Sequence, residues 1–144
     1  PRRAAPLVAD EHVFTVPERI DARGQILAPL DVATVDRIVA QMSALSLRHA
    51  AVCLLFSFVN PLHERMIGER LEKAGIAVTL SSELLPEFRE YERASVTAIN
   101  AALRPNVEAY LRELVAEIPP GIKTLRVMHS GGGTLEPADA GRVR

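Results

Sequence analysis

Cysteine is nearly absent from this 144-residue sequence, since the one residue of this type is Cys53, in the apolar run AAVCLLFSF. A single cysteine excludes a disulfide framework within the chain, and its apolar neighbours predict a small buried side chain. A chain without disulfides fits a reducing compartment, and we expect a cytoplasmic protein.

Long apolar runs and aromatic residues are also scarce. The longest apolar run, residues 50–58, is well short of the roughly 20 residues that a membrane-spanning helix needs, and no stretch has the form of a signal peptide. Tryptophan is absent, aromatic residues make up 4%, and the 17 basic and 18 acidic residues are interspersed. Such a sequence offers neither stacking platforms nor a basic stripe, so we expect no membrane partner and no nucleic-acid partner.

The four histidines do not form a metal-binding pattern. His12, His49, His63 and His129 stand far apart, and neither an H-x-x-x-H nor a C-x-x-C spacing occurs. We therefore expect no metal site in the chain. His63 falls in the first turn of a predicted helix and is expected at the surface or as a capping residue, whereas His129 precedes three glycines and could reach a ligand there.

The pattern that is present alternates between strand and helix. Residues 12–16 alternate like a half-buried strand, and the next segment supplies a turn at Gly24 and a second short extended run, which predicts a β-hairpin or two edge strands. Asp31 can cap a helix over about residues 32–47, in which apolar residues recur at helical spacing. We expect this stripe in the core, and it consists of Val35, Ile38, Met42 and Leu45.

The middle of the chain has the pattern of a strand, a helix and a second strand. The run 50–58 is apolar on both faces, as in a central strand of a parallel sheet. Asn60 and Pro61 open a helix that stops at Gly75, and residues 76–80 are the next strand candidate. A right-handed parallel crossover is the default connection for such a unit.

A long helical pattern fills residues 87–118 and contains Pro105, so either one helix kinks there or a second helix begins at that residue. Residues 124–128 are the last predicted strand. The whole pattern predicts one compact α/β domain with an open, mostly parallel sheet and helices on both faces. The later half of the long helical pattern carries an apolar stripe of Val107, Tyr110, Leu111, Leu114, Val115 and Ile118.

Two stretches could carry chemistry. Residues 81–95, SSELLPEFREYERAS, are dense in charge and fit either a solvated helix face with ion pairs or a binding segment after a strand. The stretch VMHSGGGTL, residues 127–135, lacks the spacing of a P-loop or a dinucleotide-binding loop and holds no lysine or arginine. By spacing alone, it predicts a tight turn at the end of a strand.

Four stretches together resemble the hydantoinase A/5-oxoprolinase family in their order and spacing. They are VPERIDARGQILAPLD, AVCLLFSFVNPLHERMIGERL, SSELLPEFREYERASVTAINAALRPNVEAYLREL and VMHSGGGTLEP, and they cover nearly the whole chain. Within them, the motifs NPLHE, LPEFREYER and SGGG are specific in combination.

The resemblance implies a fold and an activity for a longer parent protein. The fold is an actin-like ATPase with a ribonuclease H-like architecture, and the activity is the ATP-dependent opening of a cyclic amide such as hydantoin, N-methylhydantoin or 5-oxoproline. In that chemistry, phosphorylation of the ring oxygen creates a leaving group, and Mg²⁺ and main-chain amides neutralise the phosphate. A hydantoinase B-type subunit is the implied partner, and the parent could also form a homo-oligomer.

By the same resemblance, we expect the chain to be an internal fragment. The family's first phosphate loop, of the Asp-Thr-Gly-Gly-Thr type, does not occur in it, and further nucleotide loops would follow it. Residues 1–85 correspond to the later part of the family's N-terminal domain, and residues 86–144 to the start of the catalytic domain. We expect ATP and Mg²⁺ to bind to the full-length parent and not to this fragment, which would be inactive by itself.

The resemblance also nominates ligand-binding residues at a cleft. The family's Met-x-Ser-Asn-Gly-Gly pattern maps onto residues 128–133, with Gly131 in the place of the asparagine, so a side-chain amide is missing here. The family's Tyr-Glu-Arg string maps onto residues 91–93. Catalytic residues are expected outside the fragment. The ligand-binding candidates are His129, Ser130, Gly131, Gly132, Gly133, Glu92 and Arg93.

Two alternatives remain beside the cyclic-amide hydrolase. The chain could come from a subunit of an ATP-dependent acetone or acetophenone carboxylase of the same family. It could also be a binding or assembly module that keeps the fold without catalysis.

Overall fold

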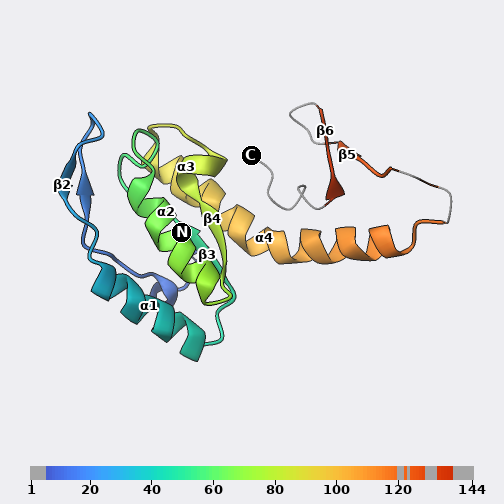
Figure 1. Ribbon diagram of the computed structural model, residues 1–144, viewed down its shortest axis with the longest axis horizontal. Helices are drawn as coiled ribbons and strands as arrows, with labels where there is room; N and C mark the ends of the chain where they lie inside the picture. The colour runs from blue at the N-terminus through green and yellow to red at the C-terminus, as the bar shows by residue number, and fades with distance from the viewer. Residues whose placement is uncertain (1–5, 120–121, 123, 129–132, 138–144) are drawn as a thin grey trace, which may run out of the picture. The chain divides into compact units, whose positions relative to one another are not determined.

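The computed structural model of the chain describes residues 6–119, 122, 124–128 and 133–137. The chain divides into two compact units, Pro1–Ala101 and Ala102–Arg144. The described residues of the first unit form a hairpin, a short 3₁₀ helix, three complete α-helices and a parallel strand pair, and the long helix α4 (Glu90–Ala116) begins in this unit (Figure 1). Among the described residues, no helix is both long enough and apolar enough to cross a membrane.

A short antiparallel hairpin lies near the start of the first unit. Its strands are β1 (Arg19–Ile20) and β2 (Ile26–Ala28), and a tight turn joins them as predicted. Oδ1 of Asp21 accepts hydrogen bonds from the backbone amides of Arg23 and Gln25, at 2.9 and 2.8 Å. The carboxylate therefore closes the turn by satisfying amides that the two strands leave unpaired.

The expected strand over residues 12–16 is wrong. Asp10–His12 form a short 3₁₀ helix, η1, and no strand is formed by residues 13–18. Phe14 and Val16 pack against the core, which explains their alternation with polar residues. Pro17 has no amide hydrogen to offer to a neighbouring strand, so the segment is buried on one side without joining a sheet.

The turn glycine of the hairpin gives a test with a matched control. Gly24 and Gly75 have φ values of 80° and 75°, which L-residues adopt with strain. A Cβ on Gly24 would also lie 3.1 Å from Cγ1 of Val59, whereas nothing lies within 4 Å of one on Gly75. We expect Gly75→Ala to cost about 1 kcal/mol and Gly24→Ala about 2–3 kcal/mol in chemical denaturation. Equal losses would contradict the close contact.

Helix α1 (Val32–Ala44) begins where predicted and ends earlier than predicted. Leu45 is half exposed rather than in the core, because the helix stops before it and Ser46 takes a φ of 57°. The remaining members of the predicted stripe do pack in the core, and they are Val35, Ile38 and Met42.

The N-terminal cap of α1 predicts a pH dependence. The carboxylate of Asp31 accepts hydrogen bonds from the hydroxyl and the amide of Thr34, at 2.7 and 3.1 Å, and these bonds, the hydroxyl's first, lower the pKa of Asp31 below its ordinary value. A lowered pKa in the folded state means that the stabilisation is present at neutral pH and is lost as the pH falls through that value. We expect Asp31→Asn to unfold at lower denaturant concentration than the native sequence at pH 7, and the difference to vanish on acidification. A pH-independent difference would contradict this.

The centre of the first unit consists of β3 (His49–Val52), α2 (Leu62–Lys73) and β4 (Ala77–Leu80). The two strands pair in parallel from His49 with Ala77 to Val52 with Leu80, so the predicted strand–helix–strand unit is confirmed. The strand predicted over residues 50–58 is too long, because the ladder ends at Val52 and a loop follows. Both strands end at the same level, because their last residues, Val52 and Leu80, pair with each other. After Leu80 the chain passes directly into the next helix.

The hydrophobic core lies where α1 and α2 pack against each other and α2 packs against the strand pair. Burial of each large aliphatic side chain there is worth about 1.5–3 kcal/mol. The buried members of this core are Leu30, Val35, Met42, Val52, Ile67, Leu71, Ile76 and Val78.

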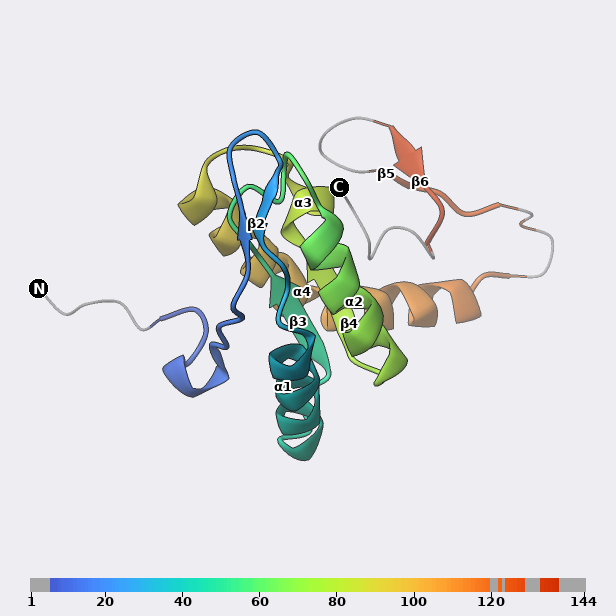
Figure 2. The same cartoon turned by 60° about the vertical axis from the view of Figure 1, so that its left-hand side comes forward.

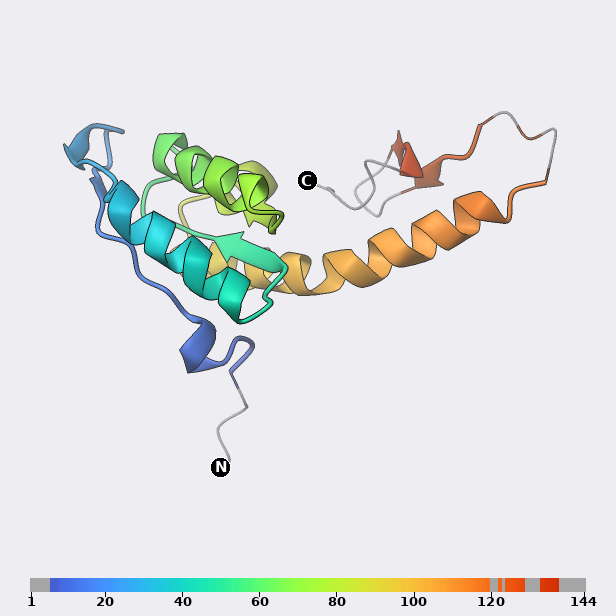
Figure 3. The ribbon, with the colours of Figure 1, turned by 60° about the horizontal axis from the view of Figure 1, so that its bottom comes forward.

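Helices cover both faces of the parallel pair (Figures 2 and 3). Gly68 of α2 lies against the side chains of Val78 and Leu80 on one face. Thr79, between them, points to the other face, where its hydroxyl donates to Oδ1 of Asn100 on α4 at 3.2 Å. Helices therefore cover both faces of the parallel strands, as predicted. The described residues do not form the predicted open, mostly parallel sheet. They form three two-stranded sheets, of which one is parallel.

Helix α4 (Glu90–Ala116) is a single helix that contains Pro105, so no second helix begins at the proline. It starts later than predicted, because α3 (Ser81–Leu84) and five non-helical residues precede it. Pro105 has no amide hydrogen, so the carbonyl of Ala101 lacks its usual helical partner. The two compact units divide immediately after Ala101. The boundary expected between residues 85 and 86 concerns the domains of the parent and stays a prediction.

The apolar stripe in the later half of the long helix is largely exposed. Leu111 is buried, but Val107, Tyr110 and Val115 are exposed. The described part of this unit contains, besides the helix, only the short strands β5 (Val127–Met128) and β6 (Thr134–Leu135), which offer little surface to cover the stripe.

The last predicted strand forms in its final two residues. β5 pairs antiparallel with β6, and the partner strand was not predicted. The glycine run falls between the two strands. Of its residues the structure describes Gly133, whose φ of 96° agrees with the predicted tight turn, while His129, Ser130, Gly131 and Gly132 lie outside the described residues.

Candidate functional site

The carboxyl ends of β3 and β4 carry a buried polar cluster. Because the strands are parallel, the loop after Val52 and the helix at Ser81 leave from the same edge. Glu64 of α2 and Arg93 of α4 reach this edge from the flanking helices, and both side chains are fully buried. Such edges are where open α/β sheets place their ligand sites, so the cluster is the candidate site of the first unit.

Glu64 acts as an acceptor for three donors from two segments. Its Oε1 accepts the Leu54 amide at 2.9 Å and the Ser81 hydroxyl at 2.6 Å, and its Oε2 accepts the Ser82 amide at 2.9 Å. The Oγ atoms of Ser57 and Ser81, both buried, lie 3.3 Å apart and extend the network. Hydrogen bonds to a charged acceptor are the strong ones, and here they join the segments that follow β3 and β4.

Sequence reasoning missed Glu64, although a signal for it was present. Glu64, Ile67 and Leu71 are spaced by three and four residues, which places the carboxylate on the apolar face of α2. A charged residue on a buried helix face needs polar partners, because burying an isolated charge is costly. That position alone predicts a buried polar network around this residue.

Arg93 binds main-chain carbonyls. Its Nη2 donates to the carbonyl of Leu54 at 2.7 Å and its Nη1 to that of Glu87 at 3.0 Å. The guanidinium carbon lies 5.2 Å from the ring centroid of Phe58, a cation–π distance. Nε is buried and has no hydrogen-bond partner among the described residues. Arg93 therefore ties the start of α4 to the loop after β3.

The two buried charges meet at one peptide residue. Glu64 accepts from the amide of Leu54 while Arg93 donates to its carbonyl, so Leu54 bridges an anion and a cation. Neither side chain is exposed to water, so the hydrogen bonds to the chain itself replace those that water would make. The arrangement fixes the backbone where β3 ends.

The loop of residues 54–60, here called the clamped loop, is held at further points. Phe56 has a φ of 57°, a conformation that a bulky residue adopts only when its surroundings enforce it. The Asn60 side-chain amide donates to the carbonyl of Gly24 at 2.8 Å, which ties the loop to the hairpin turn. Arg19 of β1 lies 5.8 Å from the Phe56 ring centroid. Several contacts thus hold the backbone of this loop in one conformation.

A second buried polar pair joins Glu18, the residue before β1, to His63 of α2. Nδ1 of His63 lies 2.7 Å from Oε2 of Glu18, and both side chains are almost fully buried. The expectation that His63 lies at the surface or caps the helix is therefore wrong. Asn60 takes part of the capping role, because its Oδ1 accepts the amide of Leu62, the first helical residue, at 3.1 Å.

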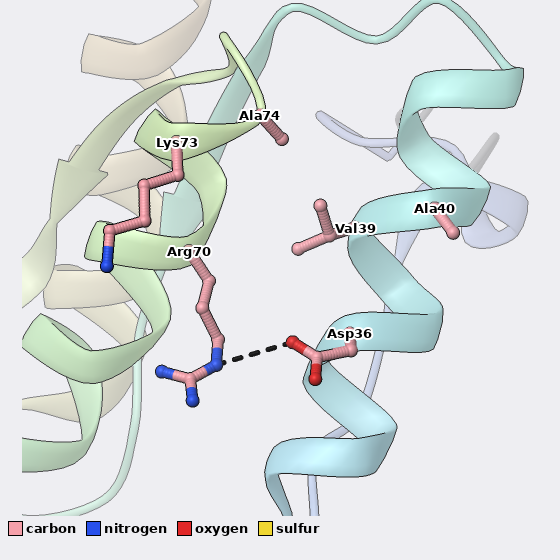
Figure 4. Close-up of a pocket in the computed structure, with 6 residues that line it drawn as sticks. All are labelled: Asp36, Val39, Ala40, Arg70, Lys73 and Ala74. Atoms are coloured by element: carbon pink, nitrogen blue, oxygen red, sulfur yellow. Dashed lines mark ion pairs between the residues drawn. The ribbon is translucent and has the colours of Figure 1, made fainter.

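A shallow groove of about 410 Å³ runs between α1 and α2 (Figure 4). Across it, Nε of Arg70 lies 3.3 Å from Oδ1 of Asp36. Such exposed pairs contribute about 0–1 kcal/mol to stability. The groove lies between the two helices and apart from the buried cluster. Its lining residues are Asp36, Val39, Ala40, Arg70, Lys73 and Ala74.

The predicted site residues lie in different surroundings. Glu92 is half exposed and its Oε1 lies 4.0 Å from Nη1 of Arg89, as in the predicted solvated helix face. Its neighbour Arg93 is buried inside the cluster. The glycine stretch belongs to the second unit, where Gly133 is described. No set of three or more His, Cys, Asp or Glu side chains within the described residues could hold a metal ion.

Comparisons with known proteins show that the chain is similar to parts of longer proteins. Residues 2–75 match the sequence profile of the hydantoinase/oxoprolinase N-terminal region. An uncharacterized protein of Methanocaldococcus jannaschii is 34% identical over 89% of this chain and 19% of its own length. The caprolactamase subunit alpha of Pseudomonas jessenii is 30% identical, over 88% and 18%. The acetophenone carboxylase gamma subunit of Aromatoleum aromaticum is 28% identical, over 72% and 15%. The chain thus spans less than a fifth of these relatives.

Two solved structures are similar in fold and sequence. A nucleotide-free acetone carboxylase, from a study of ATP-dependent acetone carboxylation, matches 94% of this chain and 20% of its own with a TM-score of 0.71 and 28% identity. The ATP-dependent caprolactamase of Pseudomonas jessenii matches 81% of this chain and 18% of its own with a TM-score of 0.71 and 26% identity.

Proposed function

The chain belongs to the hydantoinase/oxoprolinase family, and we propose that it is a scaffold portion of an ATP-dependent enzyme that hydrolyses cyclic amides. The observation that carries the proposal is its similarity, over most of its length, to an ATP-dependent caprolactamase whose name denotes a cyclic amide. The parent would have the actin-like ATPase architecture implied by the family resemblance. Hydantoins and 5-oxoproline are the proposed substrates beside larger lactams.

The buried cluster, as far as the described residues form it, offers no exposed charged group to a nucleotide. Glu64 and Arg93 are the charged side chains of the buried cluster. Their hydrogen bonds go to backbone groups and to a serine of this chain. Both are fully buried, which leaves no approach for phosphate groups. We therefore propose that ATP and Mg²⁺ bind to other parts of the parent. The role that we assign to this chain is structural, as part of the scaffold of the enzyme.

The proposed ligand contacts of this chain divide into two kinds. Glu92 is half exposed and could reach a ligand directly, whereas Arg93 would act by fixing the clamped loop and the start of α4. The glycine stretch, of which Gly133 has a backbone conformation suited to glycine, stays a proposed cleft loop of the parent.

A partner subunit belongs to this proposal. Two of the relatives are named as subunits, alpha of caprolactamase and gamma of acetophenone carboxylase, which supports a parent that works with other chains. We propose a hydantoinase B-type subunit as that partner and the cytoplasm as the compartment.

A ketone carboxylase is the second candidate function. It is favoured by the similarity to acetone carboxylase over 94% of the chain and to a subunit of acetophenone carboxylase. A carboxylase would need bicarbonate as a second substrate, and a cyclic-amide hydrolase would not.

The two functions are separated by measuring ADP release from the full-length parent with its partner subunit. We expect release with 5-oxoproline, a hydantoin or caprolactam in bicarbonate-free buffer, together with the ring-opened product. Release only with acetone or acetophenone and bicarbonate would overturn the hydrolase in favour of the carboxylase. Release with neither class would overturn both.

A further inference from the structure

The first half of helix α4 is firmly attached to the first unit. Arg93, Thr97 and Ala101 recur every four residues on one face of the helix, and all three are buried. Arg93 also donates to a carbonyl of the clamped loop at 2.7 Å, and Oδ1 of Asn100 accepts from the hydroxyl of Thr79 on β4 at 3.2 Å. This half of the helix therefore cannot change its direction without breaking these contacts.

The attachment ends where Pro105 interrupts the hydrogen bonds of the helix. Because proline has no amide hydrogen, the carbonyl of Ala101 lacks its helical partner. The two compact units divide immediately after this same residue. Beyond it, Leu103, Val107 and Tyr110 are each exposed by 40% or more. Among the described residues, side-chain packing thus gives the later half of the helix much less support than the first half.

The turn that contains the proline is helical but weakened. An uninterrupted α-helix is stiff because hydrogen bonds tie each turn to the next, and a proline both removes one of these bonds and pushes against the preceding turn. Nε of Arg104 and Oε1 of Glu108 lie 2.7 Å apart and bridge this turn. Two long side chains can keep such a contact while the backbone between them bends, so the ion pair holds the turns together without fixing their angle.

We infer that α4 is a hinge, which bends at Pro105 and lets the second unit move relative to the first. Hinges are commonly a few residues at the junction of two units, away from the chemistry, and prolines are a common cause of bending within a helix. The role of this hinge in catalysis rests on the proposed function. The glycine stretch, the proposed cleft loop of the parent, belongs to the second unit, so bending of α4 would move that loop during turnover.

The test measures the distance between two spin labels on α4 in the full-length parent, by pulsed dipolar electron paramagnetic resonance. The labels are attached to ketone-bearing unnatural amino acids at Ala94 and Arg112, which are exposed and lie on either side of the proline. A straight helix would place their Cα atoms about 27 Å apart. Pro105→Ala is the main variant, because alanine restores the amide and favours the helix. Asn106→Ala is the matched control, since it changes an exposed neighbour and keeps the proline.

The expected result concerns the width of the distance distribution without nucleotide. We expect it to be at least about twofold broader in the native parent and in Asn106→Ala than in Pro105→Ala. Equal widths would overturn the hinge even if the mean distance shifted, because Pro105 would then form a fixed kink. Equal narrowing in Asn106→Ala would also overturn it, because helix propensity rather than the proline would then decide the width.

The same parent separates the hinge from the proposed function. A broad distribution in a parent that releases ADP with neither cyclic amides nor ketones would leave the hinge standing and remove the proposed function. Equal widths in a parent that does release ADP with a cyclic amide would remove the hinge and leave the proposed function standing.

Discussion

Replacing Arg93 by methionine is expected to lower the free energy of unfolding by about 3–5 kcal/mol, because it removes two charge-assisted hydrogen bonds from a fully buried guanidinium to main-chain carbonyls. Methionine fills much of the arginine volume, so the loss reports the polar interactions more than a cavity. The carbonyls of Leu54 and Glu87 lose this donor. Chemical denaturation followed by circular dichroism measures the loss.

The control for this variant lies four residues earlier. Arg89 is largely exposed, and Arg89→Met removes the same charge from the same stretch of chain. We expect it to change stability by less than about 0.5 kcal/mol. If both variants lost the same amount, the assigned role of the buried guanidinium would be wrong.

Replacing Glu64 by glutamine is expected to cost about 3 kcal/mol, although the two side chains have nearly the same shape. Glutamine keeps one acceptor oxygen, which can serve the amide of Leu54 and the hydroxyl of Ser81. Its amide nitrogen would then face the backbone amide of Ser82, so that two donors meet where an acceptor is required. The loss is measured by denaturation at neutral pH.

Glu69→Gln is the matched control, since Glu69 lies on the exposed side of the same helix. We expect a change below about 0.5 kcal/mol for it. The double variant Glu64→Gln, Arg93→Met tests the coupling through Leu54, and it should lose less than the sum of the two single losses. Strict additivity would show that the two side chains are not coupled through Leu54.

Elements with a local chemical signal could be predicted from the sequence. Asp31 marks the start of α1 because its carboxylate caps the helix, and Gly75 ends α2 because it takes a positive φ. The parallel pairing of β3 and β4 followed from a strand, a helix and a strand in succession. In each case a few neighbouring residues carry the information.

The errors arose where tertiary contacts decide the structure. Phe14 and Val16 alternate because the core buries them, although no strand pairs with them. The apolar run from residue 50 leaves the sheet at Val52, because Glu64 and Arg93 take the amide and the carbonyl of Leu54. No pattern within the run shows that Glu64 and Arg93, which lie later in the sequence, form hydrogen bonds with the backbone of Leu54.

Of the buried cluster, Arg93 was among the ligand-binding candidates from the sequence, and the ligand-binding role of those candidates stays a prediction. The match of residues 91–93 to a family string drew attention to Arg93, which does lie at the strand edge, but its burial and its main-chain partners depend on residues 39 positions away. The neighbouring Glu92 faces solvent, because successive residues of an α-helix point about 100° apart around its axis. Glu64 was overlooked because NPLHE was treated as a helix start, while the apolar spacing that buries its carboxylate continues further along α2.

The most direct test of the central claim is the binding of ATP in the presence of Mg²⁺, measured by titration calorimetry on the isolated 144-residue chain and on the full-length parent in parallel. Circular dichroism would first establish that the isolated chain is folded. We expect saturable binding by the parent and none by the chain, because the charges at its strand edge are committed to its own backbone. Saturable binding of ATP by the isolated chain would contradict the assignment of this part of the enzyme to the scaffold.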